Sequence, residues 1–214
     1  MFIDLAASPL PSLTAPPPGM RRARGIDRWN PDRRALARFR RIAETIGAEA
    51  PLPGFDALAA AARVLAHDFA GHRRAPSIRL RLRCLTALRT MSAEPAWDLA
   101  AGDRERIASI TAYARGGDRL IPDSIPVIGG LDDAVLVELA WPSLRLELDD
   151  YLDFRRLRAE EAALRGVPPH RIGFDREQWR QARATEQALL RHVRRCGLGS
   201  YALTPSAPLF RVRG

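Results

Sequence analysis

The segment 120–133 constrains the fold more than any other part of the chain. Pro122 and Pro126 lie four residues apart within it, and Gly129-Gly130 follows. Because proline lacks the amide donor and restricts the residue before it, no continuous helix can cross 121–126. The two glycines permit a tight reversal of the backbone. The sequence therefore predicts a rigid connector between two antiparallel helices.

The same segment carries apolar residues and three carboxylates. We expect its apolar side chains to be buried around the turn: Ile121, Ile125, Val127, Ile128 and Leu131. Asp132 or Asp133 is expected to cap the helix that follows, and Asp123 to accept hydrogen bonds from backbone amides in the turn. The alternative is that these three aspartates gather around a cation, since hard cations prefer several carboxylate or carbonyl oxygens. The capping interpretation is the one we favour.

Helical periodicity extends over most of the remaining chain. The expected helices cover about 31–46, 56–70, 76–92, 103–115, 133–165 and 175–197. Asn30 is the expected cap of the first, Pro142 could bend the fifth, and Asp175 with Gln178 forms a capping box at the start of the last. Within 76–92 the alternation around Arg81 is also typical of a strand. We predict a helix there, because no other segment offers a partner strand.

The expected fold class is all-α, a helical bundle around a central helical hairpin with a Pro/Gly turn. Residues 1–28 contain a Pro/Arg-rich stretch and predict an extended arm. Residues 29–200 predict a single helical domain with its central hairpin at about 100–160. Residues 201–214 predict an extended or disordered tail.

The connector resembles the hallmark of the YkvA-like family, a bacterial domain of unknown function. The matching residues are Ile121-Pro122-Asp123, Ile125-Pro126, Gly129 and Asp132-Asp133. The chain departs from the pattern at Arg119, where the family commonly has an aspartate. Many relatives carry longer apolar helices and look membrane-associated. The shorter, charged version in this chain fits a soluble or peripheral variant. The resemblance implies no activity.

The charge of the chain is strongly positive but uneven. Its net charge is +9, and all 34 basic residues are arginine, a composition typical of GC-rich genomes as well as of chains with polyanionic partners. Residues 118–161 hold 11 acidic residues against 5 arginines, so the flanks carry the positive excess. We expect intramolecular ion pairing first, an anionic lipid surface second and nucleic acid last. Nucleic acid is disfavoured because aromatic content is 7% and no aromatic–basic interleaving suggests base stacking.

Signals for catalysis are weak elsewhere. One candidate metal cluster is His67-Asp68 with His72, but no further histidine lies nearby to complete a metal site. Cys84 lies in an apolar stretch, which is typical of a thiol in the core. No phosphate-binding glycine loop or nucleophile elbow occurs, and we expect no cofactor. No segment predicts a signal peptide or a transmembrane span, so we expect a cytoplasmic protein.

These observations favour a non-enzymatic interaction or scaffold protein over an enzyme. Its expected partner is an unknown protein or an anionic lipid surface, which would place it at the cytoplasmic face of the membrane. The alternative is a metal-dependent, hydrolase-like enzyme that uses the aspartates Asp123, Asp132 and Asp133.

Overall fold

A computed structural model describes residues 4–11, 32–46 and 54–200. This part of the chain is helical, and its only β-type pairing is an isolated bridge between Arg74 and Val127. The α-helices are α1 (Arg33–Thr45), α2 (Phe55–Asp68), α3 (Pro76–Ser92), α4 (Ala101–Arg115), α5 (Leu131–Leu164) and α6 (Arg176–Ser200). The predicted all-α class is confirmed.

Three 3₁₀ turns complete the described elements: η1 (Leu5–Ala7), η2 (Pro95–Trp97) and η3 (Pro169–Arg171). The first of them lies within residues 1–28, for which the sequence predicts an extended arm, so residues 5–7 depart from that prediction. Asp4 caps η1 by accepting a hydrogen bond from the amide of Ala6, and Leu5 is buried. An apolar side chain at the fifth residue therefore anchors the start of the chain to the core. The rest of that arm beyond residue 11, and the tail 201–214, lie outside the described residues.

Helix α1 begins later than the sequence predicts. Asp32 is its N-cap and accepts a hydrogen bond from the amide of Arg34 at 3.2 Å. Asn30, the expected cap, lies outside the described residues. Both side chains are good caps, so the local sequence does not decide between them. The predicted inward residues Phe39 and Ala43 are buried.

The ambiguous segment 76–92 is helix α3, as predicted. Pro76 occupies its first turn, where the missing amide costs nothing. Ile78, Leu85 and Leu88 are buried on one face. Arg81 is buried among them, whereas Arg79 and Arg83 of the alternating pattern are exposed.

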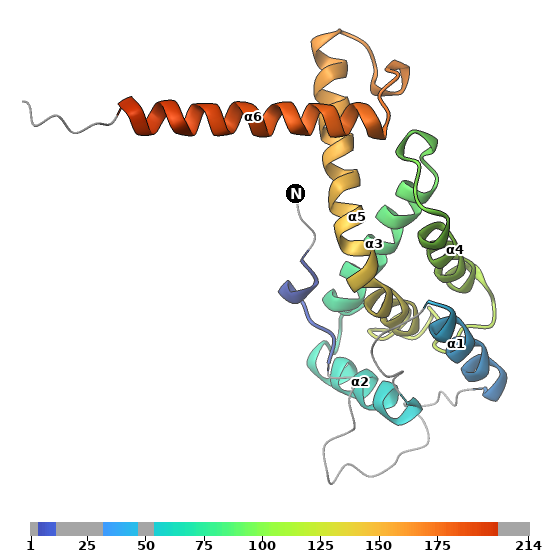
Figure 1. Cartoon of the computed structure of the whole chain (residues 1–214). Coiled ribbons are helices and arrows are strands. Elements are labelled where there is room, and N and C mark those ends of the chain that lie inside the picture. Colours follow the sequence, from blue (N-terminus) through green and yellow to red (C-terminus); the bar gives the residue numbers. More distant parts are fainter. Residues whose placement is uncertain (1–3, 12–31, 47–53, 201–214) are drawn as a thin grey trace, which may run out of the picture. The chain divides into compact units, whose positions relative to one another are not determined.

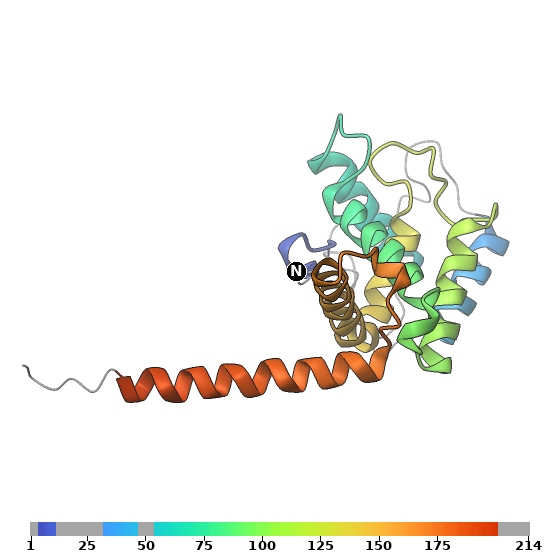
Figure 2. The same cartoon turned by 90° about the horizontal axis from the view of Figure 1, so that it is seen from above.

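Helices α1, α3 and α4 pack together in the first part of the chain. Helix α4 contacts both α3 and α1, as Figures 1 and 2 show from two directions. The Phe39 ring of α1 meets the Tyr113 ring of α4 edge-on, with centroids 6.1 Å apart. Tyr113 lies near the end of α4, just before the connector begins, and the contact packs its ring against α1.

The sequence predicts a single domain over 29–200, but the contacts between residues group the chain differently. The chain divides into two compact units, Met1–Asp153 and Phe154–Gly214. The second unit has its own aromatic contact, because Phe154 stacks on Phe174 with ring centroids 5.5 Å apart. Helix α5 contains Pro142 and remains one helix, so helical periodicity alone could not indicate the division.

Candidate functional site

The predicted connector lies between α4 and α5. Because α4 ends at Arg115 and α5 begins at Leu131, the connector in the structure is residues 116–130. The amide of Ile125 donates to the carbonyl of Pro122 at 3.1 Å, and the amide of Gly129 donates to the carbonyl of Ile125 at 2.9 Å. A side chain at Gly129 would have its Cβ 2.6 Å from the carbonyl oxygen of Asp123. Gly130 has a φ of +80°, which favours glycine. The segment is neither a straight helix nor a sheet strand, as the prolines and glycines predict.

The burial predicted for the connector is mostly confirmed. Ile121, Val127, Ile128 and Leu131 are buried. Ile125 is only partly buried, and its neighbours Ser124 and Pro126 are exposed. Val127 is unusual, because it is a β-branched residue with a φ of +67°.

Asp132 closes the connector from the inside. Its Oδ2 accepts hydrogen bonds from the Tyr113 hydroxyl at 2.7 Å and from the amide of Ile121 at 3.1 Å. The amide of Leu120 donates to the same hydroxyl at 3.0 Å. Asp132 is fully buried, so these bonds form in a water-excluded interior. One carboxylate thus links the end of α4, the connector and the start of α5; we name Tyr113 and Asp132 the latch.

The capping prediction for Asp132 and Asp133 needs correction. Helix α5 begins at Leu131, so both aspartates lie in its first turn and not at the cap position. Their charge complements the positive end of the helix dipole. The backbone amide that Asp132 binds belongs to Ile121 of the connector.

A chain of ion pairs covers the outer side of the connector. Arg119 donates to Asp123, and its Nη1 lies 3.6 Å from Oδ2 of Asp133. Arg74 donates to Oδ1 of Asp123 at 3.0 Å. Asp123 therefore accepts from two guanidinium groups, a different role from the predicted contact with backbone amides. Arg119, the departure from the YkvA-like pattern, supplies the positive charge beside these aspartates.

Burial changes the acidity of the latch and its neighbour. Burial raises the pKa of Asp132, and it raises the pKa of Asp133 to about 7 against the opposing effect of Arg119. The Asp132 charge adds to the rise at Asp133. One buried oxygen of each carboxylate, Oδ1, has no hydrogen-bond partner. The two aspartates are therefore costly to ionise together.

The latch gives a testable prediction. Tyr113→Phe keeps the ring but leaves the buried amide of Leu120 without its acceptor and removes one donor from Asp132. We expect a loss of about 1–3 kcal/mol in unfolding free energy, measured by urea denaturation. Thr111→Val, in the same helix, is the control, because the buried hydroxyl that it removes has no hydrogen-bond partner in the described part of the chain. Equal losses in the two variants would contradict the latch.

The candidate metal residues do not assemble a metal site. Within residues 4–11, 32–46 and 54–200, no group of three or more His, Cys, Asp or Glu side chains could hold a metal ion. The charge of Asp123 is already matched by Arg74 and Arg119. His67 pairs with the adjacent Asp68, with Nδ1 3.0 Å from Oδ1.

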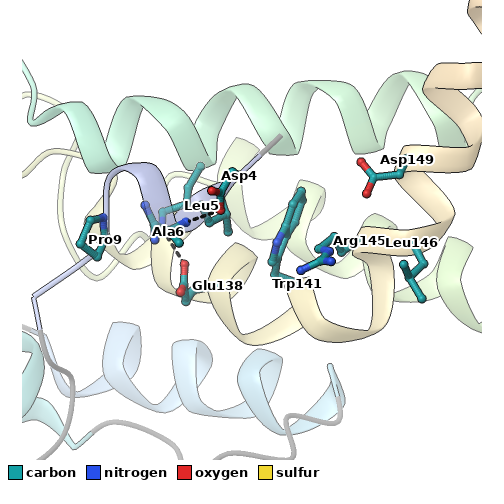
Figure 3. A pocket seen from close by; sticks show the side chains of 10 residues that line it. Asp4, Leu5, Ala6, Pro9, Glu138, Trp141, Arg145, Leu146 and Asp149 are labelled. Carbon is teal, nitrogen blue, oxygen red and sulfur yellow. Dashed lines mark hydrogen bonds and ion pairs between the residues drawn. The ribbon is translucent and has the colours of Figure 1, made fainter. Parts of the chain in front are cut away.

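A groove of about 840 Å³ lies in the first unit, and sequence reasoning missed it. Figure 3 shows Glu138 and Trp141 of α5 beside Leu5 of the N-terminal segment. Arg81 is 1% exposed at its floor and donates to Glu138 at 2.7 Å and to the carbonyl of Ser8 at 2.5 Å. The buried arginine thus fastens the N-terminal segment along the groove. The sequence around Arg81 did not indicate this role, because Glu138 and Ser8 are both distant from it along the chain.

Cys84 is a buried core residue, as predicted. Burial raises the pKa of its thiol to about 11. At neutral pH the group is therefore a thiol and not the thiolate that nucleophilic chemistry needs.

Comparisons with known proteins add no assignment. No helix in the described ranges is long and apolar enough to span a bilayer. Neither models of protein families, nor curated proteins, nor solved structures match the chain, so the YkvA-like resemblance stays a prediction.

Proposed function

We propose that the chain is a non-enzymatic interaction or scaffold protein that attaches peripherally to an anionic membrane surface through α6. The observation that carries the proposal is the second half of this helix. Leu189, Leu190 and Val193 are 59%, 51% and 56% exposed. Large apolar side chains exposed together in one short segment are typical of an interaction surface.

The arrangement of charge around these residues supports a lipid partner. At about 100° per residue, Leu189 and Val193 share one side of the helix. Arginines lie on the opposite side: Arg191, Arg194 and Arg195. No acidic residue occurs from 187 to 200. An apolar stripe opposite a basic face is the pattern of helices that lie in the membrane interface.

The first half of α6 differs, which indicates that the basic face is local. Glu186 lies 3.1 Å from Arg183 and 3.4 Å from Arg156. Trp179 is buried, and the capping box predicted at Asp175 and Gln178 forms with hydrogen bonds of 3.0 and 2.9 Å. This half is anchored by internal contacts, which leaves the second half to present its side chains outward.

Co-sedimentation with vesicles tests the proposal. We expect the protein to bind vesicles of phosphatidylcholine mixed with phosphatidylglycerol at low salt, and more weakly at high salt. Replacing both Leu189 and Val193 by Glu should weaken binding at least about tenfold, because two apolar side chains no longer enter the interface.

The matched control replaces Ala184 and Gln187 by Glu on the opposite side of α6. It changes the net charge equally and should weaken binding less than the first variant does, because the apolar side chains are kept. No binding at low salt would refute the proposal. Equal loss in both double variants would refute insertion of the apolar stripe.

The metal-dependent enzyme gains no support from the described residues. Its three aspartates are engaged by arginine, tyrosine and backbone partners, and they enclose no common space for a cation.

A further inference from the structure

A second candidate site lies in the first unit, on the outer side of the connector. A cavity of about 500 Å³ is lined by His72, Arg73, Arg74, Arg79 and Asp123. A neighbouring cavity of about 530 Å³ shares His72, Arg73 and Asp123 with it. The loop after α2, the first turn of α3 and the connector therefore border one hollow whose charged lining is mostly arginine.

The loop that carries these arginines is fixed to the connector. The amide of Val127 donates to the carbonyl of Arg73 at 3.1 Å, and the amide of Ala75 donates to the carbonyl of Val127 at 2.9 Å. Val127 makes these bonds with a φ of +67°, a conformation that costs a β-branched residue energy. The two hydrogen bonds therefore fix the backbone that carries Arg73 and Arg74 to the connector.

The arginines of the hollow differ in what they bind. Arg74 is paired with Asp123, and that carboxylate is also bound by Arg119, so the one acid in the lining is already neutralised. Arg73 and Arg79 are exposed and have no acidic partner in the described part of the chain. The hollow thus presents an excess of positive charge that the protein itself does not balance.

The chemistry of the lining selects the ligand. A guanidinium group offers a planar fork of donors that matches the oxygens of a phosphate. Several such groups around one hollow suit an anion with oxygens on several sides. The imidazole of His72, oriented by an edge-on contact with Phe69 at 5.9 Å between centroids, adds a further polar group.

We propose that His72, Arg73, Arg74 and Arg79 form a binding site for a phosphate monoester, either a soluble one or the headgroup of a lipid. The site is independent of α6, so it stands or falls separately from the proposed membrane attachment.

Two titrations of the full chain test the site. The first uses inorganic phosphate against chloride at equal ionic strength, followed by chemical-shift changes of the Arg73 and Arg79 amides. The second compares vesicles containing phosphatidic acid, a monoester, with vesicles of equal charge density containing phosphatidylglycerol, a diester. We expect phosphate to shift these amides. Tighter binding to phosphatidic acid than to phosphatidylglycerol would identify a lipid headgroup as the source, and equal binding to the two would identify a soluble monoester.

The deciding variant replaces Arg73 and Arg79 by Gln. Both side chains are exposed, so the fold should persist, and the monoester response should weaken at least about tenfold. The control replaces Arg83 and Arg89, two exposed arginines farther along α3, by Gln and should keep the response. Equal weakening in both double variants would overturn the site, as would the absence of both a phosphate-induced shift and a preference for phosphatidic acid.

Discussion

Gly129→Ala is expected to destabilise the protein by about 3 kcal/mol or more, one of the largest losses that a single methyl group could cause in this chain. The added Cβ would lie 2.6 Å from the carbonyl oxygen of Asp123 and 2.8 Å from that of Ile125. Both contacts are with backbone, which cannot rotate away as a side chain can. The connector would have to open, and the latch beneath it would be disturbed.

Urea denaturation followed by circular dichroism measures this effect. Gly102→Ala is the matched control, since no atom lies within 4 Å of its added Cβ and the residue is in the first turn of α4. Alanine there should be neutral or stabilise by about 0.5–1 kcal/mol through helix propensity. A Gly129→Ala protein as stable as the Gly102→Ala protein would show that the connector is not closely packed.

Asp133 should make the protein less stable as pH rises from about 4 to about 7. Its pKa is about 7 in the folded state against an ordinary value of 3.8. Between these values the folded state keeps a proton that the unfolded chain has released, so the unfolding free energy falls with rising pH. The fall is on the order of 1.4 kcal/mol per pH unit where the difference is complete.

Asp133→Asn should flatten this dependence and stabilise the protein most above pH 7, by a few kcal/mol. Some decline should remain, because the pKa of Asp132 is also raised. Asp118→Asn, at a side chain 87% exposed, should keep the pH dependence of the original protein. The measurement is urea denaturation across pH 4 to 8. Stability that rises over this range in the original protein would contradict the burial of Asp133.

The sequence was sufficient to predict the helical class and the connector, because both depend on local chemistry. Prolines and glycines act on their own backbone, and the absence of a partner strand decided the ambiguous segment around Arg81. The capping box at Asp175 is likewise local and was predicted correctly. The division at Asp153 was not predicted, since α5 is continuous across it and only contacts between elements reveal the boundary.

The site was predicted only in part, for the same physical reason. The motif aspartates were identified, but their partners are distant in sequence. Tyr113 lies 19 residues from Asp132, and Arg74 lies 49 residues from Asp123. Periodicity indicates which face of a helix is buried and does not indicate which side chain it meets. Among the partners of these aspartates, Arg119 was the one that the sequence singled out, because it is where the chain departs from the YkvA-like pattern that it resembles.

Amide hydrogen exchange of Leu120 and Ile121 tests the central claim, that the latch closes the connector, most directly. Neither residue belongs to a helix, so an open loop would exchange them rapidly. The amide of Leu120 donates to the Tyr113 hydroxyl and that of Ile121 donates to Asp132, both in the interior. We predict slow exchange of both amides, and fast exchange of the Leu120 amide in Tyr113→Phe. Rapid exchange of both amides in the original protein would contradict the account.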